Sequence, residues 1–311
     1  MLDVRRLRLL RELSLRGTIA AVAQALAFTP SAVSQQLSVL EREAGVPLLE
    51  RTGRRVVLTP AGRNLVRHAE AVLERLERAA AELADSRRGL AGPLRIGTFP
   101  SATRPVVLPA LAGLAERHPG LEPMVREIVP AEVGGALRTG ELDVALVHEY
   151  DFVPVPEEPG LAAQPLYEEP MFLAEDETAA PVTEAEAGRL GALLGRRREA
   201  PWITSAPGTL CHTMTVRACQ AAGFTPRVRH QVDDFAAVLD LVAAGQGVAL
   251  VPLLGAAGGA AAGPPSSVTL TGLPLRRRTL LAHRGGAARH PAVSAAVAAF
   301  RAAVPEATAG G

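Results

Sequence analysis

The apolar residues of the first 45 positions repeat at helical spacing in three short segments. In the first segment, Leu7, Leu10 and Leu13 recur every third residue, as they do on one face of an amphipathic helix. Each segment follows a residue that commonly caps a helix N-terminus, and two segments are followed by glycine. The pattern therefore predicts three helices. Their caps and stops are Asp3, Gly17, Thr18, Thr29 and Gly45, with Pro30 at the first position of the third helix.

Two short extended segments follow the third predicted helix. Residues 46–49 and 56–58 are mostly apolar, and the turn between them is basic and contains glycine. We interpret this hairpin as a small wing beside the helices. Thr59 and Pro60 then repeat the pattern of a cap followed by proline, which predicts the start of a further helix.

This further helix, from Pro60 to Arg88, would be about 43 Å long at a rise of 1.5 Å per residue. Its apolar residues form a heptad pattern, and the arginines and glutamates between them are balanced. A narrow apolar stripe is stable only against another helix, so we expect a second copy of the same helix and hence a dimer. The alternative is a surface helix that packs on its own chain. The stripe consists of Leu65, Ala69, Val72, Leu76, Ala79 and Leu83.

Glycine and proline at residues 89–93 predict a hinge, after which strands alternate with helices. This alternation predicts an α/β fold with mostly parallel sheets. Residues 151–200 are acidic and rich in proline, and we expect them to form an exposed connection with one helix. Strands are expected at residues 94–97, 142–147, 202–204, 247–252 and 280–281, and helices at residues 105–116, 235–244 and 292–303 and before Gly223.

The composition bounds the class of protein. The chain has 311 residues and is 48% hydrophobic, which is enough for more than one domain. It contains no apolar run long enough to span a membrane, and its N-terminus lacks the apolar core of a secretion signal, so a cytoplasmic protein is predicted. All 33 basic residues are arginine. The absence of lysine excludes a P-loop lysine and a pyridoxal Schiff base, and no cofactor is predicted.

The basic excess lies near the N-terminus. Residues 1–66 contain 10 arginines and 5 acidic residues, whereas the residues after position 90 contain 18 arginines and 22 acidic residues. A basic segment with a helix-turn-helix pattern predicts contact with nucleic acid. The alternative is an ordinary helical hairpin with a polar face.

Short polar side chains are expected on the exposed face of the second helix of this motif. There they can reach base edges and phosphates without blocking entry into the major groove. Gln35 is suited to pair with adenine, and the arginines of the wing are suited to the backbone or the minor groove. The predicted DNA-binding residues are Thr18, Thr29, Pro30, Ser31, Ser34, Gln35, Ser38, Arg51, Arg54 and Arg55. Double-stranded DNA is therefore a predicted partner.

These segments resemble the LysR-type transcriptional regulators. The likeness is long and specific in the N-terminal part, continues more weakly downstream and covers nearly the whole chain. Pro30 and Leu49 depart from the polar residue and the phenylalanine that are usual in the family. The similar segments are residues 18–26, 31–37, 40–51, 58–62, 94–97, 140–145 and 242–252.

The resemblance implies a winged helix-turn-helix at residues 1–59, a dimerising linker helix at 60–89 and an effector-binding domain at 93–305. It implies an effector domain like a type II periplasmic binding protein, with two Rossmann-like α/β subdomains around a small ligand. It also implies a homotetramer that bends promoter DNA. The two subdomains would comprise about 93–163 with 269–305, and about 164–268.

Hydroxyl side chains follow the predicted strand at residues 94–97. Thr98, Ser101 and Thr103 precede the helix expected at Pro105, and hydroxyls at a helix N-terminus favour an anion. They also serve simply to cap a helix, and the nearby acids Glu149 and Asp151 leave the sign of the ligand open. Adding the loops that the family resemblance implies, the predicted effector-binding residues are Thr98, Ser101, Thr103, Pro130, Ala131, His148, Thr204, Ser205 and Pro252.

Two cysteines, Cys211 and Cys219, lie close to the redox pair of the peroxide-sensing members of the family. On a continuous helix, eight residues separate them by about 12 Å, too far for a disulfide without unwinding. We interpret both as ordinary core residues, with a redox pair as the alternative. The histidines show no ligand spacing for a metal, so no metal site is predicted.

The sequence thus predicts a ligand-responsive, sequence-specific DNA-binding regulator that is not an enzyme. One alternative is a cytosolic small-molecule-binding protein, or an enzyme, that carries a DNA-binding head. No nucleophile elbow, zinc motif or glycine-rich nucleotide loop occurs to favour catalysis. Another alternative is a structural DNA-bending protein, which would not require the long α/β part.

Overall fold

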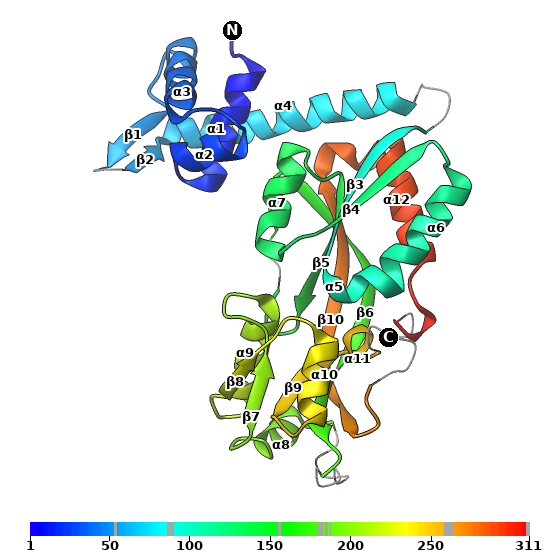
Figure 1. Ribbon diagram of the computed structural model, residues 1–311. Coiled ribbons are helices and arrows are strands. Elements are labelled where there is room, and N and C mark those ends of the chain that lie inside the picture. Colours follow the sequence, from blue (N-terminus) through cyan, green and yellow to red (C-terminus); the bar gives the residue numbers. More distant parts are fainter. Residues whose placement is uncertain are drawn as a thin grey trace.

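The computed structural model is an elongated molecule. A small helical head lies at one end, a long helix extends from it, and a larger α/β part lies below that helix (Figure 1). The chain begins in the head, and its last helix packs on the α/β part. The described residues are 1–52, 55–85, 90–154, 157–178, 183, 186, 188–257 and 264–308.

The head contains the predicted three helices and the wing. Asp3, Thr18 and Thr29 each accept hydrogen bonds from backbone N–H groups at the start of a helix, and Gly17 and Gly45 end helices with positive φ. These caps confirm the predicted helix boundaries. Leucine and valine side chains from all three helices form one core. The elements are α1 (Val4–Arg16), α2 (Ile19–Ala25), α3 (Pro30–Ala44), β1 (Leu49–Thr52) and β2 (Arg55–Leu58).

The long helix α4 spans Pro60–Asp85 and joins the head to the α/β part. Its first turns belong to the head, where Ala69 is fully buried in the core. Gly62 permits this packing, since a Cβ there would lie 2.2 Å from the carbonyl oxygen of Leu48. Later turns of α4 contact α1 and a 3₁₀ turn of the α/β part, η2 (Gly285–Arg289). The helix therefore packs partly on its own chain. The residues predicted for its last turn, 86–88, lie outside the described residues.

One mixed sheet forms the frame of the α/β part. Its order is β4-β3-β5-β10-β6-β9-β7-β8. The strands β3, β4 and β5 pair in parallel at one end, and β7, β8 and β9 at the other. Two long antiparallel strands, β6 and β10, run through both halves and join them. The bounds are β3 Gly92–Thr98, β4 Leu121–Glu127, β5 Val144–Tyr150, β6 Leu161–Asp176, β7 Pro201–Thr204, β8 Arg227–Gln231, β9 Val248–Pro252 and β10 Val268–Arg284.

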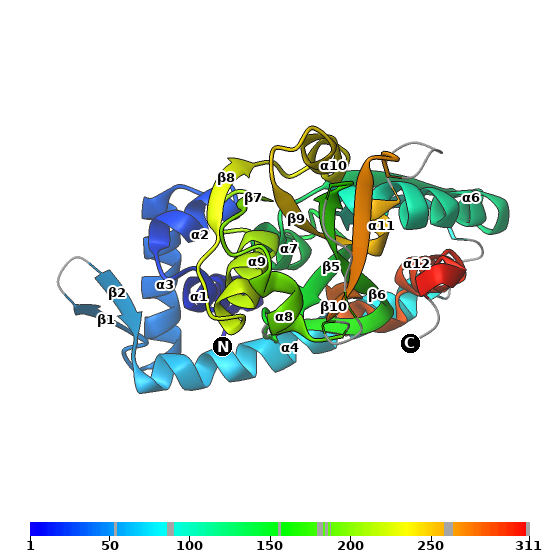
Figure 2. The same ribbon diagram turned by 90° about the horizontal axis from the view of Figure 1, so that it is seen from below.

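Helices cover the strands of each half, as the view from below shows (Figure 2). Each half has its own apolar cores, so the two halves are separate packing units. The predicted α/β class is confirmed. The helical elements are α5 Pro100–Ala102, a π-helical turn η1 Thr103–Val107, α6 Leu108–Arg117, α7 Pro130–Thr139, α8 Leu190–Gly195, α9 Leu210–Ala221, α10 Phe235–Ala243, α11 Leu253–Ala256, α12 Pro291–Ala302 and a 3₁₀ turn η3 Glu306–Thr308.

Residues 151–200 contain the expected helix, α8, but the expectation of an exposed connection is wrong, and the strand expected at residues 280–281 is confirmed but is longer than predicted. The first segment contains the long strand β6, and the second is only part of the 17-residue strand β10. The prolines of β6 suggested a loop, but Pro165 and Pro170 both lie beside register shifts, where a strand tolerates a missing N–H. Of its two buried acidic residues, Glu169 pairs with an arginine of β10 and Glu175 with Arg197.

The helix expected from Pro105 begins five residues earlier, at Pro100, and passes through the π-helical turn η1. Ser101 and Thr103 therefore lie inside a helical segment and not in a loop before it. The helix α7 and the strands β4 and β8 had no clear sequence pattern and were not predicted.

Candidate functional site

The exposed face of α3 carries most of the residues predicted to contact DNA. Val33, Leu37 and Leu40 anchor the helix in the head, which turns Gln35 and Ser38 outward. Thr18, Thr29, Pro30 and Ser31 are also exposed, and Ser34 is half-buried. The predicted face therefore forms as a surface, although its contact with DNA stays a prediction.

Two hydroxyls of this face also have structural roles. Thr18 Oγ1 accepts from the backbone N–H of Ala21 at 3.1 Å, and Thr29 Oγ1 accepts from that of Ala32 at 3.2 Å. Both are N-caps, so their substitution would affect helix stability as well as DNA contact. Such residues are poor probes of recognition.

Two charged residues that the sequence analysis missed position the recognition helix and the wing. Arg6 of α1 donates from Nε to Gln36 of α3 at 2.9 Å and pairs with Glu43. Glu41 accepts from the backbone N–H groups of Leu48 and Leu49, each at 2.9 Å. These contacts fix α3 relative to α1 and the wing relative to α3. Their exact partners are set by the tertiary fold and could not be read from spacing.

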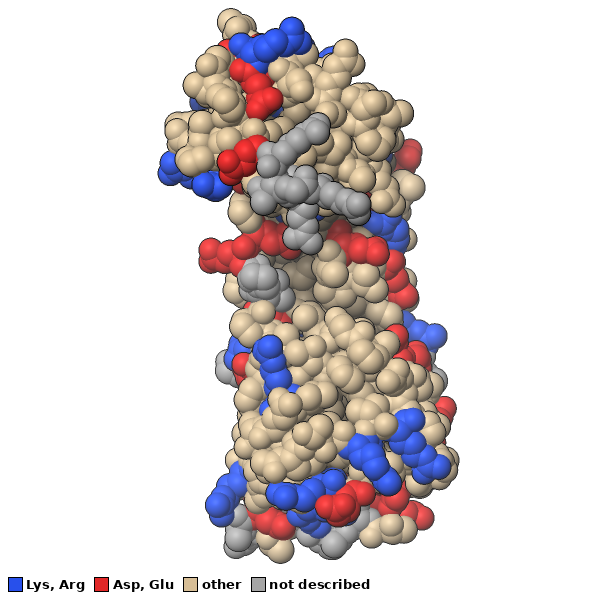
Figure 3. All heavy atoms as spheres, turned by 90° about the vertical axis from the view of Figure 1, so that its left-hand side faces the viewer, with Lys and Arg blue, Asp and Glu red and all other residues tan. Residues whose placement is uncertain are grey.

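Of the three wing arginines, Arg54 lies outside the described residues, and the side chains of Arg51 and Arg55 do as well. On the face of the molecule beside the wing, arginine side chains lie at the top of the head and acidic side chains form a band below it (Figure 3). DNA phosphates would be repelled by this band. The charge distribution therefore favours DNA on the side of the head away from the α/β part.

A cleft of about 700 Å³ lies between the two halves of the α/β part. It is bounded by segments that follow the carboxyl ends of the parallel strands, where α/β proteins commonly bind ligands. The lining residues include Phe99, Ser101, Thr103, Glu127, Pro130, His148, Tyr150, Ser205, Thr209, Cys211, Asp233, Asp234 and Arg277.

The cleft has a buried positive charge at its floor. Arg277 of β10 is 1% exposed and forms an ion pair with the fully buried Glu169 of β6, with Nη2 2.7 Å from Oε1. The Nε of Arg277 donates to the same oxygen at 2.8 Å, whereas Nη2 has no well-aligned hydrogen bond. The guanidinium carbon lies 5.2 Å from the ring centre of Phe99. A buried guanidinium with a donor that lacks an aligned hydrogen bond is suited to a carboxylate or phosphate ligand.

His148 of β5 lies beside this arginine. Burial, and secondarily the charge of Arg277, lowers the pKa of His148 to about 3, so the imidazole is neutral at physiological pH. Its Nδ1 is buried without a hydrogen-bond partner. The ring contacts Phe99 and Tyr150 edge to face. The cleft thus offers one fixed cation and one neutral hydrogen-bonding ring.

Five of the nine predicted effector residues line the cleft: Ser101, Thr103, Pro130, His148 and Ser205. The other four are not among its lining residues. Thr98 is fully buried and donates to the carbonyl of Phe99, Thr204 and Pro252 are buried at strand ends, and Ala131 is exposed on α7. Side chains alternate along a strand, so residues next to a lining residue often point away.

Thr103 has its hydroxyl engaged already. Its Oγ1 donates toward the carbonyl of Phe99 at 3.3 Å or the carboxylate of Glu127 at 3.1 Å. Glu127, Asp233 and Asp234 are exposed acidic residues at the rim, where water screens their charge. The floor therefore holds a guanidinium paired with one carboxylate, and the rim is negative.

Cys211 was predicted to be a core residue, and the structure corrects this: it is half-buried in the wall of the cleft. Cys219 is fully buried in an apolar core, as predicted. Both lie on the continuous helix α9. Burial raises the pKa of the Cys211 thiol and raises that of Cys219 to about 12, so neither is a reactive thiolate at neutral pH.

The described part of the chain contains no cluster of three or more metal-ligating side chains and no helix that is both long and apolar enough to cross a membrane.

Two family models match the chain. "Bacterial regulatory helix-turn-helix protein, lysR family" matches residues 4–63, and "LysR substrate binding domain" matches residues 87–305. The chain is 34% identical over 235 residues to a probable hydrogen peroxide-inducible genes activator of Mycobacterium avium, covering 75% of this chain and 72% of that one. It is 45% identical over 155 residues to a protein of the same name from Mycobacterium xenopi, covering 50% and 79%.

Solved structures of similar proteins show the same overall fold. A mutant of OxyR from Corynebacterium glutamicum is 25% identical, with a TM-score of 0.58, and the match covers 99% of this chain and 93% of that one. Full-length CbnR in complex with its target DNA, at 20% identity and a TM-score of 0.55, covers 97% and 100% and shares the fold. A DNA-binding head joined to a ligand cleft defines a ligand-responsive transcriptional regulator. The chain belongs to the family of LysR-type transcriptional regulators, as the sequence resemblance predicted.

Proposed function

We propose that this regulator responds to a small anionic metabolite that binds in the cleft against Arg277. The observation that carries the proposal is a buried guanidinium at the floor, with one donor nitrogen that has no aligned partner. The helices α7, α9 and α10 begin at the cleft, and the N–H groups at their N-termini add partial positive charge to it. A carboxylate or phosphate group satisfies both features.

The ligand would act by changing the orientation of the two halves of the α/β part relative to each other. Among the described strands, β6 and β10 are the two that pass through both halves, and Arg277 and Glu169 lie on them. The end of β10 leads directly into η2, which contacts α4. A ligand that favours one arrangement can therefore alter the placement of α4 and the head, by no more than its difference in affinity for the two arrangements. We retain as proposals the boundaries 1–59, 60–89 and 93–305 for the three parts.

We further propose that α4 pairs with α4 of a second copy. Beyond the head, Val72, Leu76 and Ala79 are exposed at spacings of four and three residues. Leu83 occupies the next position of the pattern and is 71% exposed when a single copy of the chain is considered. We propose this shorter stripe, which leaves out Leu65 and Ala69, as the interface between the two copies of α4. Two such dimers would form a tetramer on promoter DNA in the cytoplasm.

Thermal melting of the full chain with a panel of carboxylates and sugar phosphates tests the effector proposal. We expect at least one anion to stabilise the protein and to change the DNA footprint. Ser101→Ala, in the wall of the cleft, should weaken binding of that anion, whereas operator binding without the anion should stay at the wild-type level. An anion that leaves the footprint unchanged, or stabilisation only by cations, would refute the proposal.

A second candidate is a response to peroxide. The names of the mycobacterial relatives and the position of Cys211 in the cleft wall favour it. The raised pKa of both cysteines and the burial of Cys219 argue against a thiolate that attacks peroxide. Mass measurement after peroxide treatment separates the two candidates: a disulfide that alters the footprint and is lost in Cys211→Ser would favour peroxide sensing.

A further inference from the structure

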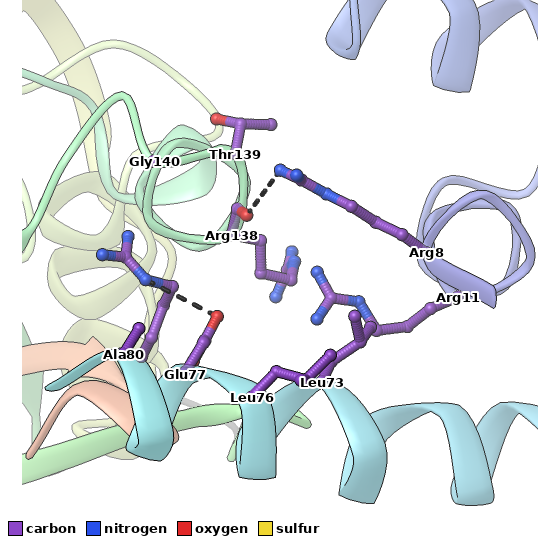
Figure 4. Close-up of a pocket in the computed structure, with 10 residues that line it drawn as sticks. Arg8, Arg11, Leu73, Leu76, Glu77, Ala80, Arg138, Thr139 and Gly140 are labelled. Carbon is purple, nitrogen blue, oxygen red and sulfur yellow. Dashed lines mark hydrogen bonds and ion pairs between the residues drawn. The ribbon is translucent and has the colours of Figure 1, made fainter. Parts of the chain in front are cut away.

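A second pocket, of about 350 Å³, lies where the head, the long helix and the α/β part meet (Figure 4). Its walls come from α1, from the middle of α4, from the end of α7 and from the end of β10. It shares no lining residue with the effector cleft, although α7 and β10 contribute residues to both. The lining residues are Arg8, Arg11, Leu73, Leu76, Glu77, Ala80, Arg138, Thr139, Gly140 and Arg284.

Four arginines surround this pocket, and two of them face one another. Figure 4 shows the guanidinium groups of Arg11, from α1, and Arg138, from α7, pointing toward each other across the space. Their side chains are 8% and 10% exposed. Each has a buried Nε without a hydrogen-bond partner. Two buried cations that face each other repel, unless an anion lies between them.

The nearby carboxylates do not balance the arginines. The ion pairs at the pocket are Arg11–Glu12 at 2.8 Å, Arg138–Glu158 at 2.7 Å, Arg284–Asp143 at 3.4 Å and Arg284–Glu77 at 3.7 Å. Glu12 is shared with Arg16, and Asp143 with Arg95. Among the described residues, Arg8 donates to the backbone carbonyl of Arg138 at 3.3 Å, and its charge acts on Glu77. Six arginines thus meet four carboxylates in this region.

Two further effects change the charge of the pocket in opposite directions. Burial raises the pKa of Glu77, the carboxylate among the lining residues, and so makes its charged form less favourable. Carbonyl groups at the C-terminus of α7 accept hydrogen bonds from Arg8 and Arg284, and a helix C-terminus offsets about half a positive charge. Excess positive charge remains.

We propose that this pocket binds a small oxyanion with at least two negative charges, carried by phosphoryl or carboxylate groups. The anion would contact Arg8 and Arg11 of the head together with Arg138 and Arg284 of the α/β part. Planar guanidinium groups bind such oxygens in pairs, and the pocket has room for a compact polyanion.

Such an anion would hold the DNA-binding head against its own α/β part. It touches both bodies, so its binding favours the arrangement in which they are close, and it loses half of its contacts when they separate. The regulator would then have two inputs: an effector in the cleft between the halves of the α/β part, and a polyanion at the junction with the head.

The experiment uses the full chain and two probes, pyrophosphate and citrate, at constant ionic strength against sodium chloride. We expect both probes to raise the Tm and to give a measurable Kd by calorimetry. Arg8→Gln removes a charge that forms no ion pair among the described residues, so the variant should fold normally and bind the probe about tenfold more weakly. Arg126→Gln, an exposed arginine of β4, is the matched control and should bind like wild type.

The effector cleft is a competing site for the same probes. The double variant Arg277→Met/Glu169→Gln, which removes the charge of the cleft floor, should therefore keep probe binding. Loss of binding in this variant together with normal binding in Arg8→Gln would place the anion in the cleft and overturn the proposal. No stabilisation beyond that of sodium chloride would also overturn it. So would a uniform loss of DNA affinity in Arg8→Gln without any probe effect, since that result would assign the arginine to the DNA backbone.

Discussion

Arg277 and Glu169 form an ion pair beneath the effector cleft, and both side chains are almost completely excluded from water. The second carboxylate oxygen of Glu169 accepts from the backbone N–H of Leu254 at 2.7 Å. The pair therefore ties together β10, β6 and the start of α11. It is at once a structural link between the strands that cross both halves and the charged floor of the proposed binding site.

Arg277→Met should reduce the free energy of unfolding by about 3–5 kcal/mol, because it leaves Glu169 charged and buried without its partner. The double variant Arg277→Met/Glu169→Gln should recover most of this loss, since glutamine is neutral and still offers an oxygen to Leu254. Urea denaturation measures both. Effector affinity should be lost in the single and the double variant alike. A double variant that is stable and binds effector normally would show that Arg277 is only a structural residue.

The head could be predicted well because its signals are local. Caps such as Asp3 and Thr29 and the spacing of Leu7, Leu10 and Leu13 act within one or two helical turns, and the structure follows them. The strands β6 and β10 could not be predicted in this way. Arg277 and Glu169 are 108 positions apart, and each alone indicates an exposed, polar segment. Only their pairing in the fold makes both burial and the cleft floor possible.

The effector site could be predicted only in part, because only some of its signals are local. Ser101 and Ser205 follow strand ends, which are visible as apolar runs followed by small polar residues, whereas His148 lies within β5. The inward or outward direction of each side chain depends on strand register, which no local pattern gave for Thr98 or Thr204.

Gln35→Ala should weaken operator binding by about 1–3 kcal/mol and relax the preference at one base pair. The side chain is exposed on α3, and removing it does not disturb the core of the head. Gel-shift titration against the operator and against single-base variants measures both effects. Binding to unrelated DNA should stay unchanged, since that binding depends on phosphates. Equal discrimination by variant and wild type would remove Gln35 from the recognition surface.

Val72→Glu should dissociate the proposed dimer, because pairing of α4 would bring two carboxylates into an apolar seam. We expect association to weaken by roughly a hundredfold or more, as measured by sedimentation of the full chain. Ala71→Glu introduces the same charge at an exposed neighbouring position away from the stripe, and it should sediment like wild type. If both variants behave alike, α4 is not the seam.

His148 should make the protein less stable in acid. Its pKa is about 3 in the folded chain, against an ordinary value near 6.5, so only the unfolded chain takes up this proton between those values. Stability therefore falls as pH decreases below about 6.5, by about 2 kcal/mol between pH 7 and pH 5. The Tm of His148→Gln should fall less over this pH range than the Tm of wild type. Equal losses of Tm in the variant and in wild type would contradict this prediction.

Gly286 should be intolerant of any side chain, because α4 packs directly against it. A Cβ at this position would lie 2.5 Å from Cβ of Glu77 and 2.6 Å from the carbonyl oxygen of Glu74. Gly286→Ala must therefore move η2 away from α4, at a cost of about 1–3 kcal/mol. The loss should appear as a lower urea midpoint with an unchanged slope.

The neighbouring glycine gives a matched control. A Cβ on Gly285 would meet its nearest atom, the carbonyl oxygen of Gly160, at an ordinary contact distance of 3.6 Å, so Gly285→Ala should unfold at nearly the wild-type midpoint. Because η2 follows the end of β10, Gly286→Ala should also weaken the effect of an effector on the DNA footprint, whereas Gly285→Ala should leave it intact. Equal behaviour of the two alanine variants in both measurements would mean that the contact between α4 and η2 neither stabilises the chain nor connects the cleft to the head.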